Sequence, residues 1–172
     1  MPHTHRRYDF VFSFFVLIAL FYAIPAYAQA LELGPEGFVE IKDGSSFKVL
    51  AGKPKNIVLK KGELFAVCEK EDAATDTALR VITPDASVRL GVGGCAVEVA
   101  KKGTLVKVFG GPVKVNAQYV SEGFKKLISK ANHRQSSSRL QYEDYKQWDL
   151  WIKKWYEQKD DLAADRLEKE YL

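Results

Sequence analysis

Short runs rich in β-branched and aromatic residues recur from Phe38 to Val115, with turn sequences between them at intervals of about 8 to 12 residues. The turns are built from glycine, proline, aspartate and serine, which supply the positive or fixed φ angles that tight turns need. Many runs alternate, as in "CAVEVA", where Cys95, Val97 and Val99 share the face opposite Glu98. The pattern predicts a mainly β fold, an antiparallel β-sandwich of two twisted sheets. The predicted strands are "FVEIK", "FKVL", "NIVLK", "ELFAVC", "ALRVIT", "SVRL", "CAVEVA", "TLVKVF" and "VKVN".

The first 28 residues are typical of a secretory signal peptide. A short basic segment precedes residues 10–24, which are almost entirely apolar, and Ala26 and Ala28 are the small residues expected before a cleavage site. An uncleaved N-terminal membrane anchor is the alternative, because the apolar stretch approaches the ~20 residues that span a bilayer. Either interpretation predicts an exported protein.

Cys68 and Cys95 are the only cysteines. An even pair in an exported chain is ordinarily oxidised, so we predict a disulfide between them. Two separately buried thiols are the alternative. A bond closing this loop would contribute roughly 3 to 4 kcal/mol in the chain-entropy description.

The stretch "RLGVGGCAVEV" places three glycines within four positions, as some phosphate-binding loops do. Such loops open a helix, whose N-terminal N–H groups hold the phosphate. Here a period-two pattern follows and no "GK[ST]" is present, so we interpret the glycines as a turn or bulge that leads into a strand.

No catalytic or metal-binding constellation emerges from the sequence. His133 is the only histidine after the leader, which leaves neither a base for a cysteine nucleophile nor a multi-histidine metal site. Glu40, Glu63 and Glu98 alternate with apolar residues, as solvent-facing strand positions do. We therefore expect no enzyme activity, no cofactor and no metal.

The region after Val120 differs in composition from the β-rich part. Residues 137–172 contain neither glycine nor proline, and they carry all three tryptophans of the chain. The spacing predicts a polar linker at 131–138 and an amphipathic helix at 139–172. Its aromatic stripe could pack on the β domain, bind a partner or a second copy, or contact glycan or a membrane surface. The candidate interface residues are Tyr145, Trp148, Trp151, Ile152 and Trp155.

The formal net charge of +4 is too small to indicate a nucleic-acid partner. Basic residues are in excess up to Ser138, and acidic residues are in excess after it. The two regions therefore differ in electrostatic character.

The β-rich part resembles the FecR domain of bacterial envelope proteins. The resemblance rests on "LKKGE" (Leu59 to Glu63), "TPDA" (Thr83 to Ala86), "VGGC" (Val92 to Cys95) and the glycine-interrupted valines of "VKVFGGPVKV" (Val106 to Val115). The chain has Gly93 and Cys95 where the family usually has arginine and threonine. The resemblance implies a non-enzymatic all-β envelope domain at residues 31–130, a kind of domain best known from inner-membrane regulators that relay a receptor signal to a sigma factor. The nine residues before the hydrophobic segment leave no room for a sigma-binding domain, so we do not expect a complete relay.

We therefore expect a periplasmic or secreted protein that binds or scaffolds another envelope protein, with a role in signalling. The alternative is a protein that binds cell-wall glycan or a surface polymer. Contact with a membrane is expected only through an uncleaved N-terminal segment.

Overall fold

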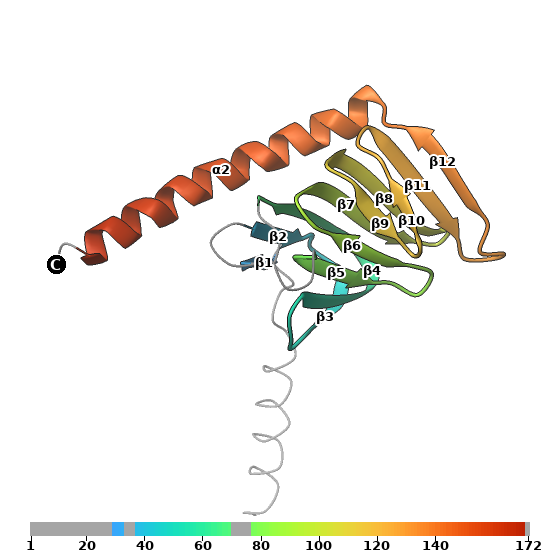
Figure 1. Cartoon of the computed structure of the whole chain (residues 1–172), viewed down its shortest axis with the longest axis horizontal. Coiled ribbons are helices and arrows are strands. Elements are labelled where there is room, and N and C mark those ends of the chain that lie inside the picture. The colour runs from blue at the N-terminus through green and yellow to red at the C-terminus, as the bar shows by residue number, and fades with distance from the viewer. Residues whose placement is uncertain (1–28, 33–36, 70–76, 171–172) are drawn as a thin grey trace, which may run out of the picture.

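The computed structural model describes residues 29–32, 37–69 and 77–170, with side chains described at 37–69 and 77–157. The predicted leader and residues 70–76, an acidic stretch after Cys68, lie outside the described residues. A strand-rich domain is followed by one long helix, α2 (Figure 1). The strands are β1 (Gln29–Glu32), β2 (Gly37–Ile41), β3 (Ser46–Leu50), β4 (Lys55–Cys68), β5 (Leu79–Ile82), β6 (Ser87–Leu90), β7 (Gly93–Ala100), β8 (Gly103–Gly110), β9 (Val113–Val115), β10 (Gln118–Val120), β11 (Phe124–Ser129) and β12 (Gln135–Arg139), and α2 is Tyr142–Glu170.

The strands form a curled sheet that folds into two layers, and β4 belongs to both. The first half of β4 pairs with β3 and β5, and the order continues through β6 and β9 to β10; we call this the open layer. The second half pairs with β2 and β7, and the order continues through β8 and β11 to β12; we call this the helix-side layer. The mainly β prediction is confirmed. The expectation of a purely antiparallel sheet is corrected, because β4 and β5 pair in parallel.

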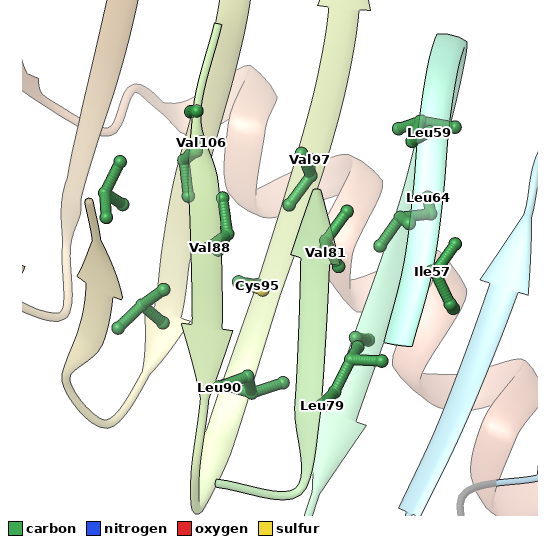
Figure 2. Close-up of a cluster of buried hydrophobic side chains, with 14 of the residues drawn as sticks. Ile57, Leu59, Leu64, Leu79, Val81, Val88, Leu90, Cys95, Val97 and Val106 are labelled. Carbon is green, nitrogen blue, oxygen red and sulfur yellow. The ribbon is translucent and has the colours of Figure 1, made fainter. Parts of the chain in front are cut away.

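The main core lies between the two layers. Figure 2 shows Ile57, Leu79 and Val88 of the open layer directed toward Leu64 and Val97 of the helix-side layer. Each strand contributes alternate residues, as the period of two requires. Valine, isoleucine and leucine dominate this core, which accounts for the β-branched runs in the sequence.

A β-bulge at Lys60 allows β4 to serve both layers. Ser46 pairs with Lys61 and Phe47 pairs with Leu59, so Lys60 has no opposite residue on β3. The extra residue reverses which alternate positions face the core. Odd-numbered Ile57 and Leu59 point inward before the bulge, and even-numbered Leu64, Ala66 and Cys68 point inward after it.

Two sequence expectations are wrong around this architecture. The "KKG" turn predicted between "NIVLK" and "ELFAVC" is instead the bend within one continuous strand. Residues 135–138 of the predicted linker, together with Arg139, form β12, which pairs with β11, and the helix begins at Tyr142 rather than at residue 139. The backbone of β11 offers an edge that polar residues can pair with, even without an apolar alternation. No helix of the described residues is long and apolar enough to cross a membrane.

Gly62 is the position at which the bend tolerates least change. Its φ is +98°, and a Cβ there would overlap Ser45, whose hydroxyl accepts a hydrogen bond from Glu63 N–H at 3.1 Å. We predict that Gly62→Ala destabilises the fold by about 2 to 3 kcal/mol, because steric overlap adds to left-handed strain. Urea unfolding measures this free energy.

Gly44→Ala is the matched control. Gly44 also has a positive φ, +74°, but its Cβ would meet no atom within 4 Å. Gly44→Ala should therefore lower the free energy of unfolding by only about 1 kcal/mol, which is the conformational penalty of a positive φ alone. Equal losses for the two variants would show that the bend at Gly62 is not sterically constrained.

Candidate functional site

The aromatic stripe of α2 lies across the outer face of the helix-side layer. The helix turns its tryptophans toward the sheet at i, i+3 and i+7 spacing, while three strands turn one phenylalanine each toward the helix. The contacts form a second core that does not mix with the first. Trp148 stacks on Phe109 with ring centroids 4.5 Å apart, Trp151 stacks on Phe65 at 5.3 Å, and Trp155 meets the edge of Phe38 at 6.4 Å.

The five candidate interface residues are brought together, but they differ in accessibility. Trp151 and Trp155 are only 6% and 5% exposed, Trp148 and Ile152 are half-buried, and Tyr145 is 38% exposed. The indole N–H of Trp151 has no acceptor within the described part of the chain, so this ring contributes through packing. A partner, glycan or membrane could reach the buried rings only if α2 left the sheet.

Gly94 provides the space for Trp148. A Cβ at this position would overlap the far end of the Trp148 indole. The predicted role of the glycine stretch as a bulge leading into a strand is confirmed, since Gly93 and Gly94 begin β7 and its register with β8 shifts between Gly94 and Cys95. The structure adds close approach of the tryptophan, which the sequence did not indicate.

Asp144 fixes the start of α2, and the sequence pattern did not single it out. Its carboxylate accepts a hydrogen bond from Gln141 N–H at 2.9 Å and pairs with Lys125 at 2.7 Å and Lys107 at 3.1 Å. Burial alone would raise the pKa of Asp144, but the backbone hydrogen bond and the two ammonium groups outweigh it and lower the pKa to about 2. The carboxylate therefore joins the helix N-terminus to β8 and β11.

A second ion pair holds the helix farther along, where Lys154 contacts Glu40 of β2 at 2.9 Å. Glu63 pairs with Lys42. Glu40, Glu63 and Glu98 are half-buried on the helix-side layer and stay out of the inter-layer core. The structure gives two of these acids a lysine partner.

The predicted disulfide is absent, because Cys68 and Cys95 are free, buried thiols. Cys95 lies opposite Ala66, and Cys68 lies opposite Gly93, so the cysteines are diagonal neighbours on β4 and β7. Diagonal Cβ atoms are about 7 Å apart, whereas a disulfide needs about 4 Å. Burial raises the pKa of Cys68 to about 12, and burial together with the nearby Cys68 raises the pKa of Cys95. Both side chains act as small apolar core residues.

A groove of about 430 Å³ opens at the β7–β8 turn, where Leu105 and Leu127 form an apolar floor. Glu98 is its one carboxylate, and Lys101 and Lys102 line it from the turn. Within the described residues, no three histidine, cysteine or acidic side chains gather to hold a metal. The groove suits an apolar side chain better than a reacting group.

No protein-family profile matches this chain, and no curated protein matches it. Its fold is similar to two crystal structures, at 2.50 and 1.65 Å resolution, of a "putative anti-sigma factor" from Parabacteroides distasonis. The TM-scores are 0.59 and 0.57, with 14% and 13% sequence identity. Each comparison covers 72% of this chain and 60% of the other, so this chain spans less than two thirds of those proteins. The likeness shows a shared fold.

Replacing Gly94 tests the docking of α2. We predict that Gly94→Ala displaces Trp148, lowers the free energy of unfolding by about 2 kcal/mol and shifts the tryptophan emission to longer wavelength. Gly110→Ala is the control, because Gly110 pairs with Gly94 but its Cβ would come no nearer than 3.5 Å to another residue. Equal effects of the two substitutions would contradict the contact.

Acidification should weaken the attachment of α2 through Asp144. Its folded pKa of about 2 lies below the ordinary value of 3.8. The associated stability, about 2 kcal/mol, is therefore complete above about pH 5 and is lost progressively as the pH falls through 2. Urea unfolding between pH 6 and pH 2.5 measures it.

Asp144→Asn should lower stability at pH 6 and flatten its decline below pH 4. Asp149→Asn removes an exposed acid from the same helix and should change neither quantity. If the free energy of unfolding depends on pH in the same way in both variants, Asp144 is not the group that anchors the helix.

Proposed function

We propose that this protein is a non-enzymatic regulatory or scaffolding module of the bacterial cell envelope. Its β domain is FecR-like, and it binds another envelope protein through the part of α2 that continues beyond the sheet. The leader at 1–28 directs the chain to the periplasm or outside the cell.

One observation carries this proposal: α2 is much longer than the surface that it covers. Its 29 residues extend about 43 Å at 1.5 Å per residue. The ring contacts with the sheet are complete by Trp155, and Figure 1 shows the helix continuing past the strands to the C-terminus. Because isolated helices are marginal in water, the continuation gains stability when a second surface covers it.

One apolar residue of the continuation keeps the spacing of the docked stripe. By spacing, Leu162 lies two turns after Trp155 on the same helical face. Tyr156 and Leu150 are 52% and 67% exposed, so the docked turns also present apolar side chains away from the sheet. A partner that covered Leu162 would continue the aromatic stripe along the helix.

The fold comparison supports a regulatory function in which a protein is the ligand. The similar solved structures carry an anti-sigma description, and the motif resemblance to FecR domains leads to the same class. The docked half of the helix gives the continuation a fixed direction. Such an arm can hold a partner at a set distance from the β domain.

Site-specific photocrosslinking in the native envelope tests the proposal. We predict that a photoreactive residue at Tyr156 or Leu162 of the full chain gives one discrete crosslinked protein. The same probe at Tyr119, which is 69% exposed on β10, should not give it.

Substituting Leu162→Asp should abolish the crosslink from position 156 while leaving the thermal midpoint unchanged, because it lies beyond the docked rings. Loss of the helix signal in circular dichroism would mean that the substitution acts through folding. Crosslinks of equal yield from position 119, or none from either helix position, would overturn the assignment of the binding surface to α2.

A further inference from the structure

The outer face of the open layer is cationic and has no acidic residue among its described strand positions. Strand alternation places thirteen side chains on this face, opposite those of the inter-layer core. Six are lysine or arginine, and the others are polar, aliphatic or aromatic. The residues are Ser46, Lys48, Leu50, Asn56, Val58, Lys60, Lys61, Arg80, Ile82, Ser87, Arg89, Lys114 and Tyr119.

Three of these cations form a straight row across adjacent strands. Arg80 of β5 lies opposite Arg89 of β6, and Arg89 lies opposite Lys114 of β9. Lys114 in turn lies opposite Tyr119 of β10. Neighbouring strands are about 4.8 Å apart, so the row presents one positive charge per strand and ends at an aromatic ring.

Local contacts hold both ends of the row. Arg80 donates a hydrogen bond from Nε to the hydroxyl of Ser87 at 3.2 Å, which leaves its other guanidinium donors available. The ammonium of Lys114 lies 5.4 Å from the centroid of the Tyr119 ring. Tyr119 is nevertheless 69% exposed.

The row contrasts with the charges of the helix-side layer. There Lys107 and Lys125 share Asp144, and Lys42 pairs with Glu63. In the described part of the chain, no ion pair joins Arg80, Arg89 or Lys114 to a carboxylate. Like charges directly opposite one another on a sheet are destabilising, so the row lowers stability in the absence of an anion.

We propose that this face binds an acidic polysaccharide, a polymer whose sugars each carry a carboxylate. Such a polymer carries many carboxylates along one chain, so several of them can pair with the cations of the row at once. Arginine binds carboxylate with two parallel N–H donors, and the Tyr119 ring offers a surface on which a sugar can stack. The polymer would lie across the strands of the open layer.

The exposed Tyr119 ring at the end of the row favours this ligand over an acidic peptide, because a sugar ring can stack on it. This inference goes beyond the protein partner proposed for α2, since it concerns a different surface.

Binding of the full-length protein to polygalacturonate, which has one carboxylate per sugar, tests the inference. Low-salt binding should weaken at least about tenfold on raising the salt to 0.3 M, because exposed charges are screened. Methyl-esterified polygalacturonate, which lacks the charges, should not bind. The triple variant Arg80→Gln, Arg89→Gln, Lys114→Gln should bind at least about tenfold more weakly than the unsubstituted protein.

The control variant Lys101→Gln, Lys102→Gln, Lys130→Gln removes the same charge from exposed positions near the β7–β8 turn and should retain binding. The row variant should keep or raise the thermal midpoint, and the exposed Arg89→Gln alone provides a second test if the triple variant folds poorly.

Equal loss in row and control variants, or no binding of the acidic polymer at low salt, would overturn the inference. Tighter binding of poly-L-glutamate or of a single-stranded oligonucleotide would overturn it in favour of that ligand class. Photocrosslinking through α2 is independent of all these outcomes.

Discussion

The passage of β4 from one layer to the other is the constraint on which the rest of the structure depends. Without the extra residue at Lys60, the second half of β4 would turn Phe65 and Val67 into the inter-layer core and expose Leu64, Ala66 and Cys68. The bulge instead gives both halves the correct face, and Gly62 supplies the adjoining φ of +98°. Both the core and the helix-docking surface follow from this local irregularity.

The same irregularity accounts for one of the places where the sequence was misleading, and polar pairing and strand register account for the others. Strand content and the alternation in β7 and β8 were predictable, because valines at every second position are characteristic of a strand with one buried face. The single strand β4 was not predictable. Its buried positions change from odd to even numbers beside "KKG", and two strands joined by a turn would show the same change. Strand β12 lacked any apolar alternation, because its serines contribute paired backbone rather than buried side chains. The free cysteines depended on a register that only the folded sheet defines.

Only the helix side of the helix-docking site could be predicted from the sequence. The tryptophan stripe on α2 was recognisable from its spacing, but its counterpart was divided among Phe38, Phe65 and Phe109, each on a different strand. Phenylalanines on the face opposite inward-pointing valines indicate a strand that is covered on both sides, and this signal was present in the sequence. Asp144 was harder to identify, because its anchoring role depends on ion pairs with Lys107 and Lys125, which lie on two different strands. Three groups that are distant in sequence share one buried contact.

The distribution of charge on the folded surface also could not be predicted from the amino-acid composition. A net charge of +4 indicates a nearly balanced protein, yet the described acids are unevenly distributed between the two outer faces. On the helix-side layer, carboxylates neutralise the lysines and a helix covers the surface. On the open layer, alternate positions of strands between Ser46 and Val120 assemble cations that are scattered in sequence. Because α2 and the cationic row occupy opposite layers, a ligand on one of the two proposed surfaces would not obstruct a ligand on the other.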